Sequence, residues 1–516
     1  MQKSKTDTVA AIDVGSNSVR MMIAQVHPDG SVLPLEDLRK ATQIGKDTFS
    51  YGRIQVESIH DTCEILRGFS KLMQDYKVKL YRAVCTSGIR EAENREYVLE
   101  QIRIRTGLEV EVINNAQERF LMYKAMKDHL TGAQKASDKG ILIVDIRSGG
   151  VEISVYDEGN LKFTEYIKVG SLRLREILAD LERLTLDFPS IMEEFVESRI
   201  DFLKTLISER QIMHFIGLGG ELRTITRLCA DMEEEPGADH FVRKKALARL
   251  YTSVHSMTTE QIIQAYGLQK NQAEILLPSV ILFNRFLKMT NAEGISAPMV
   301  SLRNGMLADI ADELFDTPRK ASSLNDVISS VWYIGQKYYI DRVHSQNIEK
   351  LALAVFDQTG RYHRLGEKER FYLRVAAILH DVGKYVNLNQ HDIHSYNIIR
   401  FQDVMGFSDR ELNLIANIAR YHSEELPQLS HDNYRVLSSR DQIIVSKLAV
   451  MLKLAEAMDI SHKQKITDIE LAASGEELIF KVRADEDILL EEWSFEPHVT
   501  FFEEVMGIKP VLKRRG

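Results

Sequence analysis

The sequence has little cysteine and no long hydrophobic run. Its 516 residues include only Cys63, Cys85 and Cys229, which show no paired spacing, so a zinc site built from cysteines is excluded and reduced thiols are expected. The longest apolar run, residues 275–283, contains Pro278 and is shorter than the roughly 20 residues that cross a membrane. The polar N-terminus is followed by no signal-peptide core. We therefore expect a soluble, cytoplasmic protein without an integral membrane segment.

An excess of positive charge is also missing. The chain has 75 acidic residues against 66 lysines and arginines, a formal net charge of −9, which argues against indiscriminate coating of nucleic acid. We expect no nucleic-acid partner, and a polyanionic ligand would have to be met by local basic groups. With 44% apolar and 27% charged residues the composition is globular. At about 100 to 200 residues per domain, the length predicts three or four domains.

The most informative stretch that is present covers residues 9–24, VAAIDVGSNSVRMMIA. An apolar strand ends near Asp13, a tight turn follows, and a second apolar strand leaves. The turn consists of Gly15, Ser16, Asn17 and Ser18. The glycine lets backbone approach a ligand, the serines offer hydroxyls, successive N–H groups can bind an anion, and the aspartate can hold a hard cation. This pattern favours a hairpin that grips phosphate.

The same plan recurs in residues 140–159, GILIVDIRSGGVEISVYDEG, with Asp145 in the place of Asp13 and Ser148 in the place of Ser16. Two copies imply two similar lobes. An acid at each first turn is what a cleft enzyme needs to hold phosphates and a metal from opposite walls. The alternative is two ordinary hairpins whose glycines and acids serve only turn geometry.

Three further segments place polar residues where an expected strand gives way to a helix. Arg90 follows the strand 80–85, Glu118 lies at a helix start, and Gly219 and Gly220 lie in a glycine turn between a strand and a helix. Open α/β folds put ligand contacts at such places. Taken alone, the glutamate fits simple charge complementarity with the helix dipole, and the glycines are a weak signal.

From residue 321 onward the pattern changes to amphipathic helices. Strand signals return only near the end, where we expect a small α+β tail with strands at 468–471, 477–482 and 499–502. We therefore divide the chain into two α/β lobes, a helical domain and a C-terminal α+β domain. Their expected bounds are 1–133, 134–314, 315–466 and 467–516.

The helical domain carries histidines and acids in a suggestive arrangement. They are His344, His380, Asp381, His394, His422 and Asp459. A histidine beside an aspartate at the end of a buried helix, with further imidazoles on neighbouring helices, can bind one or two divalent metals, and a metal-bound hydroxide could attack phosphorus. The alternative is a set of hydrogen-bonded core histidines.

Together these segments resemble the exopolyphosphatase and guanosine pentaphosphate phosphatase (Ppx/GppA) family over nearly the whole chain. The segments, in the family's order, are AAIDVGSNSVRMMIA, TSGIREAENRE, VINNAQERF, ILIVDIRSGGVEISV, IGLGGELRTI and LRNGML. The resemblance implies two actin-like, ribonuclease-H-like lobes followed by an all-α HD-type domain and a small α+β domain. It also implies a homodimer.

The resemblance assigns roles to the residues in the lobes. Asp13, Asp145 and Glu152 would bind Mg²⁺ or Mn²⁺, Glu118 would orient or deprotonate the attacking water, and Arg90 would contact a phosphate. Substrate contacts are expected from Gly15, Ser16, Asn17, Ser18, Arg147, Ser148, Gly149, Gly150, Gly219 and Gly220. Phosphoanhydride hydrolysis needs charge neutralisation and an in-line water, which these groups can supply.

Departures from the family pattern raise two questions. Arg147 stands where the family has a glycine, so it either clamps phosphate, for which a guanidinium is well suited, or fills the cleft and lowers activity. We favour a working phosphatase because all four acids are present. In the helical domain the resemblance is to HD phosphohydrolases and implies a second divalent metal, but Glu456 replaces the usual distal aspartate and Asp459 lies one turn on.

The sequence thus favours an exopolyphosphatase that processively removes terminal phosphate from inorganic polyphosphate, with guanosine pentaphosphate as a further substrate. One alternative is a metal-dependent hydrolase at the HD-type site, with the lobes as a sensor. The other is a non-catalytic sensor of polyphosphate or of guanosine penta- or tetraphosphate.

Overall fold

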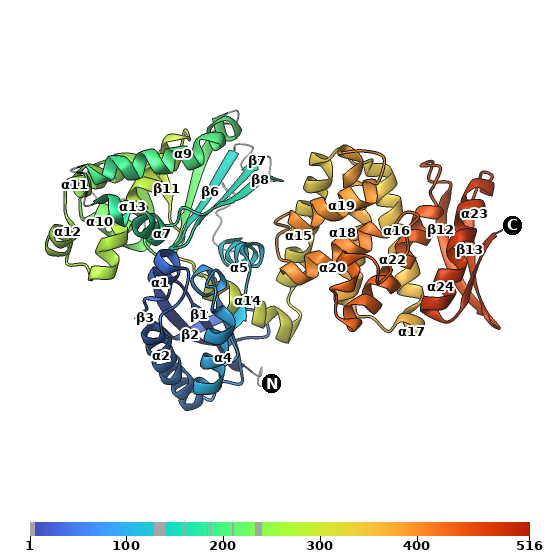
Figure 1. Cartoon of the computed structure of the whole chain (residues 1–516), viewed down its shortest axis with the longest axis horizontal. Coiled ribbons are helices and arrows are strands. Elements are labelled where there is room, and N and C mark those ends of the chain that lie inside the picture. Colours follow the sequence, from blue (N-terminus) through green and yellow to red (C-terminus); the bar gives the residue numbers. More distant parts are fainter. Residues whose placement is uncertain are drawn as a thin grey trace. The chain divides into compact units, whose positions relative to one another are not determined.

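The computed structural model describes residues 6–127, 140–157, 160–182, 184–185, 187–208, 211–232 and 240–515. The chain divides into two compact units, Met1–Leu324 and Asn325–Gly516, each of which is described by itself (Figure 1). The expected boundary at 133/134 lies outside the described residues.

The first lobe of Met1–Leu324 is built on a five-stranded sheet. Its strands are β1 (Asp7–Val14), β2 (Ser18–Val26), β3 (Val32–Ala41), β4 (Leu80–Cys85) and β5 (Glu111–Val112), in the order β3-β2-β1-β4-β5. Strand β1 pairs antiparallel with β2 and parallel with β4. Residues 9–14 of β1 are all buried, which explains why this strand reads as a continuous apolar run. The helices of this lobe are α1 (Ile44–Tyr51), α2 (Val56–Asp75), α3 (Ser87–Arg90), α4 (Arg95–Thr106) and α5 (Asn115–Lys127).

The second lobe repeats this strand order in a six-stranded sheet. Its strands are β6 (Gly140–Ile146), β7 (Val151–Asp157), β8 (Asn160–Ile167), β9 (Ile212–Leu218), β10 (Phe241–Arg243) and β11 (Gly294–Ser296), in the order β10-β11-β9-β6-β7-β8. Strand β6 pairs antiparallel with β7 and parallel with β9, as β1 does with β2 and β4. The repeat that the two acidic turns predict is therefore present in the strand topology.

Helix α13 (Lys270–Lys288) is the centre of the second lobe's core. Nearly every residue from Ile275 to Leu287 is buried, and Pro278 lies inside the helix. The longest apolar run of the sequence is thus a core helix, and among the described residues no helix is long and apolar enough to cross a membrane. The other helices here are α7 (Ser171–Ile177), α8 (Ala179–Glu182), α9 (Phe188–Ser208), α10 (Leu222–Asp231), α11 (Lys244–His255) and α12 (Thr259–Tyr266).

Helix α14 (Leu302–Phe315) follows the second lobe in sequence but packs on the first. It lies against α5 and β1. At Gly305 an added Cβ would stand 2.0 Å from the carbonyl oxygen of Leu121, so only glycine allows the two helices to approach this closely. The expected second lobe, 134–314, therefore ends with a helix that completes the first lobe.

The unit Asn325–Gly516 begins within α15 (Pro318–Lys337) and consists mainly of helices. They are α16 (Arg342–Gln358), α17 (Gly360–His363), α18 (Glu367–Leu379), the 3₁₀ turn η1 (Val382–Tyr385), α19 (His391–Phe401), α20 (Asp409–Arg420), α21 (Asp432–Arg435) and α22 (Ser439–Ala457). Helices α16, α18, α20 and α22 pack on one another. Helix α22 is buried on most of its faces, as expected of a central helix.

A three-stranded sheet completes this unit. Strand β12 (Ile466–Ser474) forms a hairpin with β13 (Glu477–Ala484), and β14 (Lys509–Arg514) pairs parallel with β13. The strand expected at 499–502 is wrong, because those residues begin helix α24 (Val499–Met506), which follows α23 (Leu489–Phe495) and a 3₁₀ turn η2 (Glu496–His498). Four consecutive residues could not reveal the helical spacing, which appears only when buried Met506 is included.

Candidate functional site

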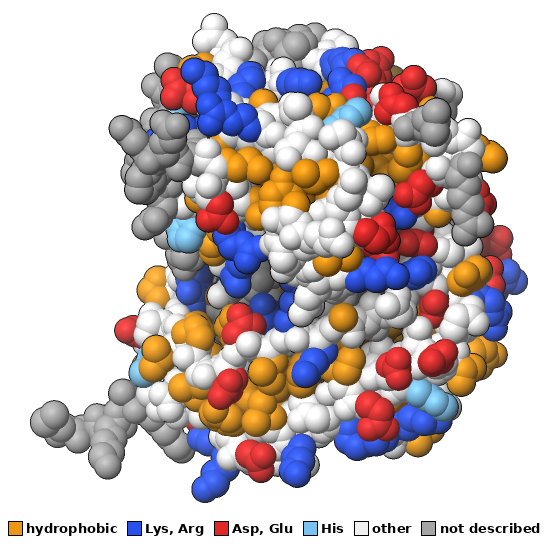
Figure 2. Space-filling model, turned by 90° about the vertical axis from the view of Figure 1, so that its left-hand side faces the viewer, with side chains coloured by type: hydrophobic (Ala, Val, Ile, Leu, Met, Phe, Trp, Pro, Cys, Tyr) orange, Lys and Arg blue, Asp and Glu red, His pale blue; other side chains and the backbone are white. Residues whose placement is uncertain are grey.

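Both acidic turns face one cavity of about 290 Å³ in Met1–Leu324. The sequence-predicted residues that line it are Asp13, Gly15, Ser16, Asn17, Ser18, Glu118, Asp145, Arg147, Ser148, Gly219 and Gly220. Figure 2 shows Lys and Arg side chains gathered around a hollow on one face of the molecule. The structure therefore brings together most of the residues that were singled out from two strand-turn-strand motifs and two separate helix starts.

Four arginines line the same cavity and were missed in the sequence. They are Arg20, Arg39, Arg223 and Arg303. Arg20 could have been found from the sequence, because it is the cross-strand partner of Asp13 in the β1–β2 hairpin. Burial and the neighbouring guanidinium of Arg20 lower the pKa of Arg39. Guanidiniums crowded in this way favour an anionic ligand.

The first turn is closed by its own hydrogen bonds. The Gly15 N–H donates to the Ser18 carbonyl oxygen over 3.1 Å, and Arg20 Nε donates to Ser18 Oγ over 2.9 Å. The hydroxyls of Ser16 and Ser87 are 3.1 Å apart, which ties the turn to the start of α3. The turn is therefore preformed rather than dependent on a ligand for its shape.

Two aspartates of the cavity each offer an oxygen to a cation, although no group of three acids or histidines in the described part of this unit lies close enough together to hold one. Asp13 Oδ1 and Asp145 Oδ1 are buried and have no hydrogen-bond partner among the described residues. Burial raises the pKa of Asp13, although Arg20 and Arg303 oppose this shift. A buried carboxylate oxygen without a donor is costly, and carboxylates are the ligands that Mg²⁺ and Mn²⁺ prefer.

Arg147 joins the expected base to an expected metal ligand. Its Nη1 lies 2.5 Å from Glu118 Oε1, and its Nη2 lies 2.6 Å from Asp145 Oδ2. These two carboxylates outweigh the effect of burial and raise the pKa of the Arg147 guanidinium. Burial also raises the pKa of Glu118, while Arg147 and Arg90 act in the opposite direction. Arg147 thus lines the cavity and bridges Glu118 and Asp145.

Arg90 supports Glu118 rather than facing the cavity. Its Nη1 donates to the Ile113 carbonyl oxygen over 2.6 Å, and its Nη2 donates to Asn115 Oδ1 over 2.5 Å. The guanidinium lies 3.6 Å from Glu118 Oε2, and Arg90 is absent from the described residues that line the cavity. The expected contact between Arg90 and a phosphate stays a prediction.

Gly149 and Gly150 pack closely instead of lining the cavity. An added Cβ would stand 2.1 Å from Ser87 Oγ at Gly149 and 2.3 Å from the Tyr166 ring at Gly150. These glycines let the second turn approach its neighbours, so their residue type has a packing reason. Ser148 and Arg147 of the same turn do line the cavity, and the expected phosphate loop stays a prediction.

Glu152 lies behind Asp145. The two residues are cross-strand partners in the β6–β7 pair. The Glu152 Oε1 atom lies 3.0 Å from Arg119 Nη1 and accepts a hydrogen bond from Thr164 over 3.1 Å. Glu152 lines a small recess that it shares with Asp145 and Arg147 rather than the main cavity. Sequence reasoning missed Arg119, whose pairing with Glu152 fixes that carboxylate.

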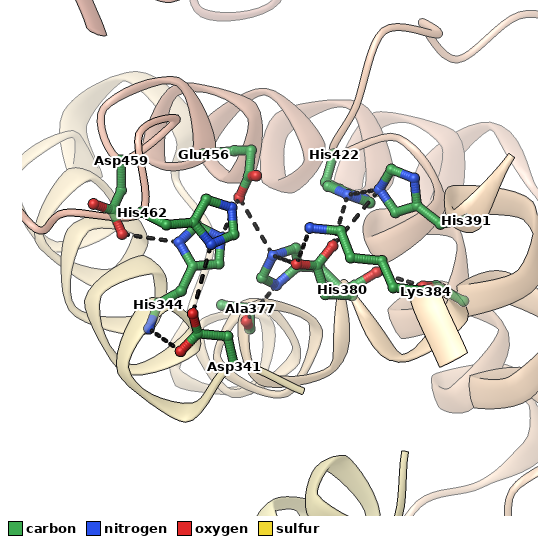
Figure 3. A network of polar contacts seen from close by, with 12 residues as sticks. Asp341, His344, Ala377, His380, Lys384, His391, His422, Glu456, Asp459 and His462 are labelled. Carbon is green, nitrogen blue, oxygen red and sulfur yellow. Dashed lines mark hydrogen bonds and ion pairs between the residues drawn. The ribbon is translucent and has the colours of Figure 1, made fainter. Parts of the chain in front are cut away.

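The unit Asn325–Gly516 contains a second cluster of possible ligands (Figure 3). His344, His380 and Asp381 come together, and Asp381 also meets His391 and His422. Two expected ligands are placed differently. His394 belongs to no such group among the described residues, and Asp459 accepts a hydrogen bond from His344 Nδ1 over 2.8 Å.

Sequence reasoning missed His391 and His462 in this cluster, and it did not assign Glu456 as a metal ligand. Glu456 lies 3.2 Å from His344 Nε2 and 3.3 Å from His380 Nε2, so it occupies the place expected for Asp459. Despite burial, the neighbouring carboxylates raise the pKa of His380 to about 10 and that of His344 to about 9. His391 could have been found only by comparing the two helix-α19 histidines, which lie one turn apart.

Two lobes of one strand order, each of which carries an acidic turn to a common cavity, define a duplicated α/β protein. Sequence comparison is more specific. Residues 22–314 match the Ppx/GppA phosphatase family, and residues 328–495 match Ppx/GppA phosphatase domain III. The chain belongs to the Ppx/GppA phosphatase family. The HD-type assignment of its helical domain stays a prediction.

Individual relatives extend over nearly the whole chain. A guanosine-5'-triphosphate,3'-diphosphate pyrophosphatase of Vibrio parahaemolyticus is 22% identical over 489 residues, which cover 94% of this chain and 93% of the relative. One of Photobacterium profundum is 23% identical and covers 86% of each chain. The crystal structure of an exopolyphosphatase from Cytophaga hutchinsonii is 20% identical, covers 60% of this chain and 98% of that chain, and has a TM-score of 0.53. At this identity the structural likeness supports the fold alone.

Proposed function

We propose that the cavity between the acidic turns hydrolyses the terminal phosphoanhydride bond of a phosphate chain. The observation that carries this proposal is the convergence of Asp13, Glu118 and Asp145 on one cavity that arginines also line. Carboxylates for a cation, a carboxylate for water and guanidiniums for phosphate oxygens are the groups that this reaction requires.

Each group has a distinct part in the reaction. Glu118 accepts a proton from water as the water oxygen bonds to the terminal phosphorus, and the bond from that phosphorus to the bridging oxygen breaks. The remaining chain leaves with the bridging oxygen, and inorganic phosphate is released. Asp13 and Asp145 would hold Mg²⁺ or Mn²⁺, which neutralises charge on phosphate oxygens when bound. Arg147 and Arg20 hold the transferred and neighbouring phosphates.

The end of the substrate is a triphosphate or a longer chain. Guanosine pentaphosphate and inorganic polyphosphate share this chemistry, and both remain substrates of the proposal. We favour guanosine pentaphosphate because relatives that match almost the full length carry the corresponding pyrophosphatase name. The sequence alone favoured polyphosphate, so the activity on both substrates has to be compared.

The test compares phosphate release from both substrates by wild type and Glu118→Gln. Loss of a general base lowers the rate by about 10²- to 10⁴-fold, so a decrease of at least about 100-fold is expected. The matched control is Glu96→Gln, because Glu96 is exposed on α4 in the same lobe and pairs only with a neighbouring arginine among the described residues. Equal rates for Glu118→Gln and Glu96→Gln would refute the proposed base. Tight binding of both substrates by wild type without turnover would identify a sensor instead.

A further inference from the structure

The histidine cluster of Asn325–Gly516 has one property that hydrogen-bonded core histidines do not need. Each of four imidazoles places Nδ1 at hydrogen-bond distance from an oxygen that can only accept, and turns Nε2 toward Asp381, Glu456 or both; Figure 3 shows these histidines around Glu456 and Lys384. The pairs are His344 with Asp459 at 2.8 Å, His380 with the Ala377 carbonyl at 2.8 Å, His391 with the Leu388 carbonyl at 3.2 Å, and His422 with the Ala419 carbonyl at 2.6 Å. A carbonyl oxygen can only accept, so these Nδ1 atoms carry the proton and Nε2 keeps its lone pair in the neutral ring.

The clearest case is the pair formed by His391 and His422. Their Nε2 atoms lie 3.0 Å apart, and each lies 3.6 Å from Asp381 Oδ1. Two lone pairs at this distance repel unless a cation or a proton lies between them. Asp381 Oδ1 is buried and has no hydrogen-bond partner among the described residues. Three donor atoms therefore surround one point that needs positive charge.

A second point lies on the other side of the same aspartate. His380 Nε2 is 3.4 Å from Asp381 Oδ2 and 3.3 Å from Glu456 Oε2, and His344 Nε2 is 3.2 Å from that glutamate oxygen. His380 Nε2 is itself buried without a hydrogen-bond partner among the described residues. The two oxygens of Asp381 thus face two different sets of imidazoles.

The separations match those between ligands of one cation. Atoms bound at about 2.1 Å lie about 3.0 Å apart in octahedral and about 3.4 Å apart in tetrahedral geometry, from the ligand distances typical of histidine and carboxylate sites. The donor-to-donor distances in the two sets, 3.0 to 3.6 Å, fall around these values. If these contacts were ordinary hydrogen bonds instead, one of the two donor atoms in each contact would have to carry a proton and point it at the other atom.

We propose that this cluster binds two divalent transition-metal cations bridged by Asp381, one held by His391 and His422 and the other by His344, His380 and Glu456. The donors are imidazole nitrogens and carboxylate oxygens without sulfur, a set that suits Mn²⁺, Fe²⁺, Co²⁺ or Zn²⁺ better than Mg²⁺ or Ca²⁺. Lys384, whose Nζ lies 2.5 Å from Asp381 Oδ2, supplies the compensating charge when no cation is bound. The proposal is independent of the cleft reaction.

Asp459 and Glu456 receive different roles in this proposal. Asp459 is a positioning residue that fixes the His344 tautomer, because it accepts from Nδ1 and leaves Nε2 for the cation. Glu456 is the ligand. Asp459→Asn would therefore weaken the site that contains His344 and leave the His391 site occupied.

The test is the metal content of the tag-free full chain after stripping with chelator and dialysis against Mn²⁺ or Zn²⁺. An Asp13→Asn/Asp145→Asn background excludes binding in the cleft. We expect two equivalents per chain, one in His391→Asn and none in Asp381→Asn. The control is His394→Asn, because His394 lies on the same helix outside the cluster, and it should keep both equivalents.

The outcomes separate a metal centre from a network of protonated histidines. Binding that is equal in His391→Asn and His394→Asn, or absent from the background protein, would overturn the proposal and leave an ion-paired histidine core. Co²⁺ provides a second readout, because its visible absorption reports direct coordination. His391 is partly exposed, so His391→Asn is expected to fold even if Asp381→Asn does not, which melting curves of both variants will show.

Discussion

At the scale of single residues, Arg147 is the cavity residue whose contacts depart most from the family pattern. It pairs with the proposed base and with a proposed metal ligand, and it stands where the family pattern has glycine. Two buried carboxylates and one partly buried guanidinium form a charge network in which removal of the arginine leaves the acids uncompensated. We therefore expect the residue to be part of the catalytic arrangement in this chain rather than a tolerated substitution.

Arg147→Gly is expected to lower kcat/KM for phosphate release by about 10- to 100-fold, because one charge-assisted contact to a phosphate is lost. Arg147→Lys should recover little, since an ammonium cannot bridge Glu118 and Asp145 as a planar fork does. Steady-state kinetics with guanosine pentaphosphate and polyphosphate provide the measurement. A gain of activity in Arg147→Gly would show instead that the arginine holds the site closed.

The pH dependence gives an independent check on the same residue. Burial raises the pKa of Glu118, and the positive charge of Arg147 opposes that shift. Glu118 accepts a proton only when ionised, so activity is lost as the pH falls through its pKa. In Arg147→Gly the opposing charge is gone, the pKa rises further, and the acidic limb of the kcat/KM profile should move to higher pH. An unchanged limb would mean that the two groups do not interact during turnover.

Single residues also mark the limit of sequence reasoning. That Asp13, Glu118 and Asp145 share one cavity could be predicted, because two of them lie near strand ends and one lies in the first turn of a helix; their roles stay predictions. His394 could not be distinguished from His391, since the two lie on one helix and only packing decides which one turns inward. Arg39 and Arg303 could not be predicted either, because nothing local marks an arginine that reaches a cavity from a distant strand or helix.

At the scale of elements, the close approach of α5 and α14 determines how the first lobe is completed. Gly305 has no room for a Cβ beside the Leu121 carbonyl, so Gly305→Ala must separate the helices or shift their backbones. We expect a loss of about 1 to 3 kcal/mol in the free energy of unfolding. Denaturant melts of the full chain provide the measurement.

The matched control is Gly68→Ala, at an exposed position of helix α2 with nothing within 4 Å of an added Cβ. This change should stabilise the chain by about 0.5 to 1 kcal/mol, because alanine is the better helix former. Similar effects of the two substitutions would show that the helix contact is not tight.

Packing also decides the secondary structure of short apolar stretches. Residues 499–502 were expected to form a strand, but they begin helix α24, because four apolar residues alone do not distinguish a strand from a helix.

At the scale of the whole molecule, the duplicated turn predicted the repeated strand order but not the full course of the chain. The second lobe's own sequence ends with α14, which returns to the first lobe, and the boundary between the compact units falls within α15. Neither feature has a local signal, because both depend on contacts between segments far apart in sequence. The expected homodimer stays a prediction for the same reason.

The two compact units each have their own core and their own proposed site, so calorimetry of the full chain should show two thermal transitions. A ligand that binds only the folded state raises the stability of its unit by about 2.7 kcal/mol at 100 times its Kd. Zn²⁺ should therefore raise one transition, and this effect should disappear in Asp381→Asn. Mg²⁺ with tripolyphosphate should raise the other transition, and that effect should disappear in Asp13→Asn/Asp145→Asn. One cooperative transition that responds to both ligands would show that the units unfold together and that their sites are energetically coupled.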